Sequence, residues 1–177
     1  ADFGGQKYTS ARLITRGLGS WAHGFVEVRA KMPCGKGTWP AIWMLGTNGP
    51  WPAIGEIDIL EHMGHSPEQV SSAVHTAAGS GGRSVHGTAR LPDACTAFHD
   101  YQLLWTRDSL VFGVDGVAHW QYARRPGDAR GWPFDQPHFM ILNLAIGGDL
   151  GGEVDDAVFP VTLEVEHVRV WQAKGAR

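Results

Sequence analysis

Short apolar or alternating runs, broken every several residues by glycine or proline, constrain the fold of this chain more than any other feature. The sequence contains 24 Gly and 10 Pro, and helical periodicity is scarce. An Asp-Gly pair between two apolar runs, at residues 115 and 116, is typical of a β-hairpin. We therefore expect an all-β chain whose antiparallel strands form two packed sheets, a β-sandwich or jelly roll with a concave face. The predicted strands lie within residues 10–15, 24–32, 37–45, 56–63, 69–76, 100–106, 109–116, 117–123, 138–146 and 162–171.

Length and composition favour one globular unit. A chain of 177 residues with 43% hydrophobic content is long enough to bury a sizeable core. No internal repeat interrupts it, and the glycine-rich segment at residues 79–84 is too short for a linker and is predicted to be a loop. The sequence therefore predicts a single domain over residues 1–177.

The charge pattern excludes two classes of partner. Charged residues make up 19% of the chain, the net charge is -3, and no run of Lys and Arg forms the basic footprint of a nucleic-acid-binding protein. No stretch approaches the roughly 20 continuous apolar residues of a membrane span. The first ten residues lack the segments of a signal peptide, so any leader is expected to have been removed. A neutral partner is expected.

The two cysteines, Cys34 and Cys95, lie in turn-like segments that can meet in the fold. A disulfide needs Cα atoms within about 7 Å, which the sequence does not fix, so a bridge and two reduced thiols are both open. Eight tryptophans are many for a chain of this length, and some of them are candidates for binding a ligand.

Three carboxylates in one predicted strand, within the stretch GEIDILEHMG at residues 55–64, are the strongest functional signal. Alternation along a strand puts Glu56 and Asp58 on one face and Glu61 on the other. A β-bulge that adds one residue between Asp58 and Glu61 returns all three acids to the same face. The two glutamates are then about 13 Å apart at Cα, and inward-leaning side chains bring their carboxyl groups to about 5 to 6 Å.

That separation suits retaining glycoside hydrolysis, in which the two carboxyl groups stand about 5 to 5.5 Å apart. One carboxylate attacks the anomeric carbon, while the other gives its proton to the leaving oxygen and then activates water. A short aspartate between them can keep one neighbour protonated near neutral pH. Spacing alone does not say which glutamate attacks. A Ca²⁺ site is the competing interpretation, ranked lower because ligands so far apart along one strand converge poorly on one ion.

Aromatic and polar residues near the acids fit a carbohydrate cleft, because sugars present C–H faces to rings and hydroxyls to polar groups. Trp39 and Trp43 share a face if residues 37–45 form a strand, and Trp51 precedes the acids by five residues. Core packing is the alternative for each tryptophan. Polar candidates within the predicted strands, each with an equally open structural role, are Arg29, His75 and Asn143.

These segments together resemble one family. EIDILE, flanked in order by YTSARLITRG, GFVEVRAKMPCGKGTWPAIWMLG, FHDYQLLWT, WPFDQPHFMILNLAIGGDLGG and EVEHVRVW, is similar to the laminarinase-like endo-β-1,3-glucanases of glycoside hydrolase family 16. The match runs along essentially the whole chain. The resemblance implies a concanavalin-like jelly roll with a glucan cleft and a retaining mechanism. The extra residue between the last two acids matches the bulged branch of the family, which includes laminarinases, agarases and carrageenases.

The resemblance also assigns roles. Glu56 matches the nucleophile, Asp58 the assisting aspartate and Glu61 the acid/base. The segments that contain the candidate tryptophans, Arg29 and His75 resemble those that line the family's cleft. No redox cofactor is implied.

Two departures from the family pattern affect what is expected of metal and assembly. Members usually carry several dozen further residues at the amino end, so we expect a shortened sandwich with exposed strand edges, which leaves dimerisation and oligomeric state open. A structural Ca²⁺ is also in question, because Glu166 replaces the usual aspartate of the last strand.

The expected function is internal, retaining hydrolysis of β-1,3-glucosidic bonds in laminarin-like β-glucans by a secreted or periplasmic enzyme. Mixed-linkage β-1,3-1,4-glucan is the second expected substrate. A non-catalytic glucan-binding module on the same fold is the rival of another class, and an agarase or carrageenase is the rival within the branch. Sulfated substrates call for more basic cleft residues than this sequence offers.

Overall fold

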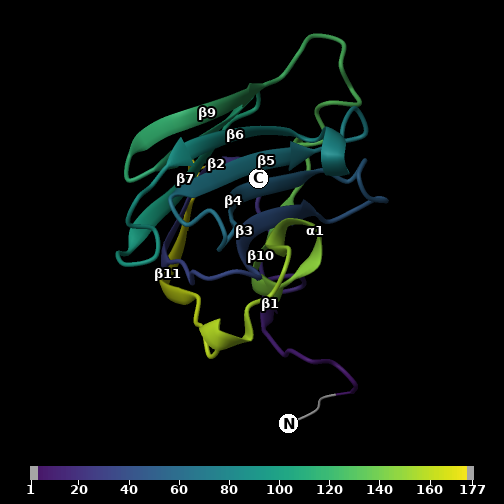
Figure 1. The fold of residues 1–177 in the computed structure, drawn as a ribbon. Helices are drawn as coiled ribbons and strands as arrows, with labels where there is room; N and C mark the ends of the chain where they lie inside the picture. Colours follow the sequence, from purple (N-terminus) through teal and green to yellow (C-terminus); the bar gives the residue numbers. More distant parts are fainter. Residues whose placement is uncertain (1–3, 175–177) are drawn as a thin grey trace.

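Two antiparallel sheets make up the fold in the computed structural model, which describes residues 4–174 (Figure 1). The six-stranded sheet has the order β1 (Arg12–Ile14), β10 (His138–Ile146), β3 (Thr38–Gly46), β4 (Glu56–His62), β5 (Gln69–His75) and β6 (Val85–Arg90). The five-stranded sheet has the order β11 (Glu164–Trp171), β2 (Gly24–Lys31), β7 (His99–Trp105), β8 (Ser109–Val114) and β9 (Val117–Ala123). The all-β jelly-roll prediction is confirmed.

Every strand expected from the sequence is present, with ends that differ by a few residues. The hairpin turn between β8 and β9 holds Asp115 at φ 51° and Gly116 at φ 78°, the left-handed conformations that an Asp-Gly turn favours. The sequence missed β6. Its sequence VHGTAR contains a glycine and little apolar periodicity, but pairing with β5 along residues 69–74 supplies a full antiparallel ladder.

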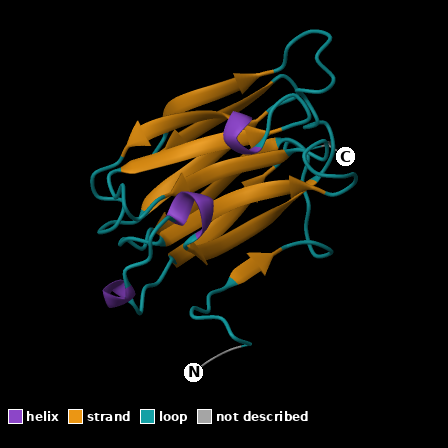
Figure 2. Cartoon of the chain, turned by 45° about the vertical axis from the view of Figure 1, so that its right-hand side comes forward, coloured by secondary structure: helices purple, strands orange, loops and turns teal. Residues whose placement is uncertain are grey.

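Helices play a small part. The described residues contain α1 (Gly148–Gly151) and two 3-10 turns, η1 (Gly81–Arg83) and η2 (Asp156–Val158), all in the loops that join strands (Figure 2). The predicted loop at residues 79–84 contains η1. None of the helices among residues 4–174 has the length and apolar character needed to cross a membrane.

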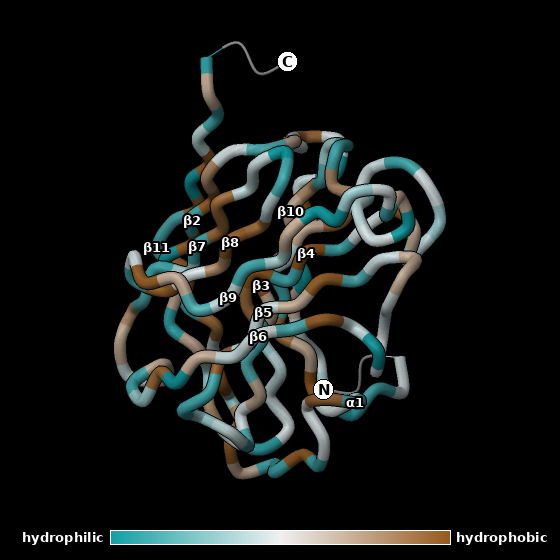
Figure 3. The backbone as a smooth tube through the Cα atoms, turned by 90° about the horizontal axis from the view of Figure 1, so that it is seen from above, coloured by the Kyte–Doolittle hydropathy of each residue, from teal (hydrophilic) through white to brown (hydrophobic). Residues whose placement is uncertain are grey.

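The core lies between the two sheets. The strands that supply its fully buried residues are β2, β3, β4, β5, β7, β8 and β10, while β9 and β11 add partly buried side chains such as Trp120 and Val170. In β2, buried Val26, Val28 and Ala30 alternate with more exposed residues, the period of two expected for a strand with one buried face. Hydrophobic residues recur along the strands in the same way in Figure 3. The largest fully buried side chains include Trp105, Tyr101, Phe112, Phe134, Leu103 and Met140.

Close packing also joins the two sheets at the β6 and β9 end. Gly87 of β6 lies against the ring of Trp120 in β9, and a Cβ at this glycine would collide with the Cγ and Cβ atoms of that tryptophan. Trp120 in turn stacks on Phe112 with ring centroids 4.9 Å apart. A glycine is therefore required where the rim of the six-stranded sheet meets the other layer.

A disulfide joins Cys34, which follows β2, to Cys95, which precedes β7, with Cα atoms 5.7 Å apart. Of the two states left open by the sequence, the structure has the bridged one. The bond closes a loop with a sequence separation of 61 residues that contains β3, β4, β5 and β6. It therefore encloses most of the six-stranded sheet.

We predict that replacing both cysteines by serine lowers the free energy of unfolding by about 2 to 4 kcal/mol. The bridge restricts the unfolded chain across a long loop, and the variant loses that restriction. Denaturant unfolding with and without a thiol reductant measures this. The reductant should destabilise the parent chain and leave the double variant unchanged, since the sequence has no other cysteine. Equal stability of parent and variant would contradict a constraining role.

Candidate active site

The three acids occupy one bulged strand. On one side of β4, Trp43 pairs with Asp58 and Ile42 with Leu60, so Ile59 has no partner of its own. On the other side, Ala73 pairs with Asp58 and Ser71 with Glu61. Both ladders therefore contain the extra residue that the spacing of the acids predicted, and the bulge prediction is confirmed.

The bulge aligns Glu61 with a row of residues that crosses the whole six-stranded sheet. Direct cross-strand partners share a face, so each row below presents its side chains on the same side. The row through Glu61 consists of Arg12, Asn143, Ala41, Glu61, Ser71 and Thr88. The next row runs through Asp58 and contains Trp43, Asp58, Ala73 and His86, and the third contains Leu45, Glu56 and His75.

A cavity of about 450 Å³ lies over these rows. Its floor contains all three acids, with Trp39 and Trp43 from β3 and Asn143 from β10. Its remaining lining comes from the segment before and within β1, from the end of β10 and from one further residue of β3, and consists of Ser10, Ala11, Arg12, Leu144, Ala145 and Ala41. Sugar-sized volume, carboxyl groups and indole rings therefore occur together.

Each acid has a neighbour that fixes it. The indole Nε1–H of Trp51 donates to Glu56 at 2.8 Å, and that of Trp39 donates to Glu61 at 3.1 Å. Nε2 of His75 lies 3.2 Å from Oδ2 of Asp58 and 3.9 Å from the Oε1 atom of Glu56. The two glutamates therefore have different surroundings, because each accepts a hydrogen bond from a different tryptophan.

His75 has a defined orientation. Its Nδ1 accepts a hydrogen bond from the backbone N–H of Gly81, at 3.0 Å, in the loop that contains η1. A neutral ring that accepts at Nδ1 carries its proton on Nε2, the atom that faces the carboxyl groups. The loop therefore fixes the ring so that Nε2 faces Asp58 and Glu56. The glycine-rich sequence at residues 79–84 gave no sign of this contact.

Burial raises the pKa of all three acids. Burial and then the charge of Asp58 raise the pKa of Glu56 to about 7. Burial and then the charge of Glu61 raise the pKa of Asp58 well above its ordinary value, and burial raises the pKa of Glu61 despite the opposing hydrogen bond from Trp39. Near neutral pH the group therefore retains protons, which is the condition for one member to act as a general acid.

Trp43 and Asn143 form a second fixed pair in the cavity. The indole Nε1–H of Trp43 donates to the Oδ1 atom of Asn143 at 2.7 Å. The guanidinium of Arg12 lies over the ring of Trp43, with its carbon 4.8 Å from the ring centroid. Sequence reasoning did not identify Arg12. Its place opposite Asn143 in the β1–β10 ladder is visible only once the register is known.

Arg29 is a correction. The sequence placed it among the cleft residues, but β2 belongs to the other sheet, and Arg29 alternates with buried Val28 and Ala30 on the outer face of that sheet. There it donates to Glu166 at 2.9 Å and to Asp100 at 3.3 Å. Its polar character within a predicted strand did not reveal which sheet carries that strand.

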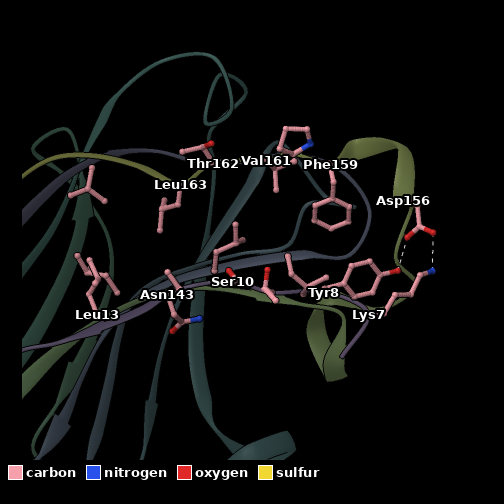
Figure 4. Close-up of a pocket in the computed structure, with 17 residues that line it drawn as sticks. Lys7, Tyr8, Ser10, Leu13, Asn143, Asp156, Phe159, Val161, Thr162 and Leu163 are labelled. Atoms are coloured by element: carbon pink, nitrogen blue, oxygen red, sulfur yellow. Dashed lines mark hydrogen bonds and ion pairs between the residues drawn. The ribbon is translucent and has the colours of Figure 1, made fainter. Parts of the chain in front are cut away.

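A larger cavity, of about 960 Å³, opens between the outer strands of the two sheets, next to β1 and β11 (Figure 4). Its one carboxylate, Asp156, is bound by the Lys7 ammonium at 2.8 Å and the Tyr8 hydroxyl at 2.6 Å. Much of the remaining lining is aliphatic, as Leu13, Val161 and Leu163 show in Figure 4. This cavity offers no pair of carboxylates and is not the candidate active site.

The clusters of potential metal ligands among residues 4–174 are mixed in composition. Three groups could hold a metal ion by proximity, and each contains histidine or cysteine ligands. The group on the outer face of the five-stranded sheet is Glu27, Asp100 and His167, but Glu27 already accepts from Gln102 at 2.8 Å. Because Ca²⁺ takes six to eight oxygen ligands, a cluster of this composition is a poor match.

Comparison with known proteins places the chain in a family. The family model described as Glycosyl hydrolases family 16 matches residues 2–158. This chain belongs to that family. The beta-glucanase of Rhodothermus marinus is 45% identical over 182 residues, which cover 95% of this chain and 64% of the relative. The chain thus spans less than two thirds of that relative's length.

Solved structures of this family share the fold. The laminarinase from Rhodothermus marinus has a TM-score of 0.92 and 44% identity, covering 96% of this chain and 73% of that one. A mutant of a non-specific endo-beta-1,3(4)-glucanase has a TM-score of 0.93 and 46% identity, covering 98% of this chain and 69% of that one. It was co-crystallised with 1,3-beta-D-cellotriosyl-glucose and presents 1,3-beta-D-cellobiosyl-glucose at its active site. Family 16 members of this kind therefore have the sandwich described above.

The raised pKa of Glu56 has a consequence for stability. A folded-state pKa of about 7 against an ordinary value of 4.5 means that the folded chain binds this proton more tightly than the unfolded chain. Stability from this group is therefore complete below about pH 4.5 and is lost as the pH rises through about 7, by about 3 kcal/mol in total.

We predict that Glu56→Gln has nearly the parent stability near pH 4.5 and becomes more stable than the parent by up to about 3 kcal/mol above pH 7. Denaturant unfolding at a series of pH values measures the difference. Glu153→Gln is the matched control, because Glu153 is exposed and should show no such trend. If the difference in free energy of unfolding between the parent and Glu56→Gln does not change with pH, the raised pKa of Glu56 is contradicted.

Proposed function

We propose that this chain hydrolyses internal β-1,3-glucosidic bonds of laminarin-like β-glucans with retention of anomeric configuration. The observation that carries the proposal is the bulge of β4, which puts Glu56 and Glu61 on the same face, in the floor of one cavity, with Asp58 between them. Two flanking carboxyl groups on one face are what retaining glycoside hydrolysis requires. The proposal agrees with the names of the similar family members.

In the first step, Glu56 acts as the nucleophile. Its carboxylate oxygen bonds to the anomeric carbon while the glycosidic C–O bond breaks, and Glu61 transfers its proton to the departing oxygen. The raised pKa of Glu61 favours the protonated form that this step needs. Glu56 attacks as the carboxylate, which forms as the pH rises through about 7, and burial also raises the pKa of Asp58 beside it.

In the second step, Glu61 is the base. It takes a proton from water as the water oxygen bonds to the anomeric carbon, and the Glu56–sugar bond breaks to release the carboxylate. Both glutamates return to their starting state, so the cycle needs no redox cofactor. The Nε2–H of His75 beside Asp58 and Glu56 stabilises negative charge as it returns to Glu56.

The glucan would lie along the rows of the concave sheet. Trp39, Trp43 and Trp51 offer ring faces to the sugar C–H groups, while Asn143 and His75 offer polar atoms to the hydroxyls. Trp51 is 52% exposed, which leaves much of its ring free for contact with a ligand. The outer-face position of Arg29 removes it from this set.

Mixed-linkage β-1,3-1,4-glucan is the second proposed substrate. The similar endo-beta-1,3(4)-glucanase is described as non-specific, and the sugar at its active site contains a cellobiosyl unit. An intact set of three acids favours an enzyme over the rival glucan-binding module. Export is part of the proposal too, since a disulfide such as Cys34–Cys95 persists in oxidising compartments.

The first test measures reducing-sugar release from laminarin and from mixed-linkage glucan. We expect the parent chain to release a ladder of oligosaccharides, the mark of internal cleavage, and Glu56→Gln to lose at least about a thousandfold in kcat. Glu153→Gln, on the exposed surface, should match the parent. Equal release by the parent and Glu56→Gln would refute the mechanism, and binding without release by the parent would favour the glucan-binding module.

A second test assigns the two glutamates. Azide, a small anionic nucleophile, is added to Glu56→Gly and to Glu61→Gly. The substrate is laminaribiose that carries an activated leaving group in β-linkage at its anomeric carbon. Because azide would occupy the space of the missing nucleophile in the first variant, we expect an α-glycosyl azide there. In the second variant azide would attack the glycosyl-enzyme, giving a β-glycosyl azide. The opposite pair of products would exchange the two roles.

A further inference from the structure

The bulge that places Glu61 has its own hydrogen-bond partner. Ser72 of β5 lies between the ladder pairs Asp58–Ala73 and Glu61–Ser71, so it faces the extra residue Ile59. The Ser72 hydroxyl donates to the backbone carbonyl of Ile59 at 2.8 Å. Both residues are almost fully buried, at 1% and 2% exposure. A side chain therefore satisfies a carbonyl at the position where the regular ladder is broken.

The same hydroxyl has a second partner from the opposite sheet. Nε2 of His119 in β9 lies 3.1 Å from the Oγ atom of Ser72. The Ser72 proton is already donated to Ile59, whose carbonyl can only accept, so Oγ acts as the acceptor and Nε2 of His119 carries a proton. Burial lowers the pKa of His119, in keeping with a neutral ring.

His119 is itself the extra residue of a bulge. In the β8–β9 ladder, Phe112 pairs with Trp120 and Gly113 with Ala118, so His119 has no partner. Its side chain turns into the space between the sheets and reaches Ser72. The two bulges, one in β4 and one in β9, are thus linked through a single hydroxyl across the sandwich.

We propose that Ser72 and His119 are positioning residues that hold the β4 bulge in register and thereby keep Glu61 on the cleft face. The proposal rests on the function proposed above. A slip of one residue at the bulge would turn Glu61 away from the cavity, because side chains alternate along a strand. The neighbouring bond from the Ser71 hydroxyl to the Glu61 carbonyl is longer, at 3.4 Å, so the Ser72 bond is the shorter of the two that hold this segment.

Loss of the link should affect turnover more than binding. The residues that would contact the sugar lie on other strands, β3 and β10, and have no hydrogen bond with Ser72. They are Trp39, Trp43 and Asn143. Glu61, which must be placed to transfer a proton, follows Ile59 by two residues. Misplacement of a reacting group by about 1 Å can lower a rate by about a hundredfold.

The first experiment compares Ser72→Ala with Val70→Ala, using the full chain and laminarin. Val70 is on the same strand and the same core-facing side, and it is 1% exposed, so its truncation destabilises the core without touching the bulge. Both variants are assayed at a temperature where circular dichroism shows the folded signal. We expect Ser72→Ala to lose about tenfold to a hundredfold in kcat with KM changed less than about twofold, and Val70→Ala to keep both.

The second experiment uses His119→Gln and His119→Leu. Glutamine keeps an N–H donor near the position of Nε2, whereas leucine fills the space without one. We expect His119→Gln to retain most of the parent kcat and His119→Leu to fall in the same way as Ser72→Ala. In the parent, nitrogen NMR of the His119 ring should show the proton on Nε2.

The outcomes separate this proposal from the function it rests on. Turnover by the parent chain tests the function, and only the variants test the positioning. Parent-like kcat in Ser72→Ala or in His119→Leu would overturn the positioning role, as would a loss in Val70→Ala equal to that in Ser72→Ala. If Ser72→Ala does not fold, the contrast between His119→Gln and His119→Leu decides, and equal kcat for the two would overturn the proposal.

Discussion

One extra residue in β4 is the constraint on which the candidate site depends. With Ile59 as the bulged residue, Glu61 pairs with Ala41 and Ser71 and joins the row that carries Asn143 and Arg12. A regular strand would place Leu60 there instead and direct Glu61 into the core. The cavity, the Trp39 contact and the raised pKa of Glu61 all follow from that single insertion.

Features that depend on short stretches of sequence could be predicted. The offsets between Glu56, Asp58 and Glu61 required the bulge, and the even offset of Trp39 and Trp43 placed both on one face, as the cavity lining confirms. Alternation likewise gave most strands. The sequence failed for β6, because its stability comes from pairing with β5 rather than from its own residues.

Features that depend on the order of strands within sheets could not be predicted. Arg29 has the same polar character as Asn143, but β2 and β10 belong to different sheets, and only the topology separates them. Arg12, Ser72 and His119 escaped notice for the same reason. Each has a contact with a strand that lies far along the chain, as the 47-residue separation of Ser72 and His119 illustrates.

The chemistry and the stability of this sheet oppose each other. Three carboxyl groups in one buried segment weaken the fold as they ionise, yet the raised pKa values that cause this are what make proton transfer near neutral pH feasible. The sheet offsets the cost locally, with indole donors on both glutamates and a serine on the bulge carbonyl. The Cys34–Cys95 disulfide also offsets this loss of stability, because the loop that it closes contains the strand that bears the acids. A strand with three buried acids therefore needs support from the strands beside it and from the opposite sheet. The Ser72–His119 hydrogen bond supplies the contact with the opposite sheet.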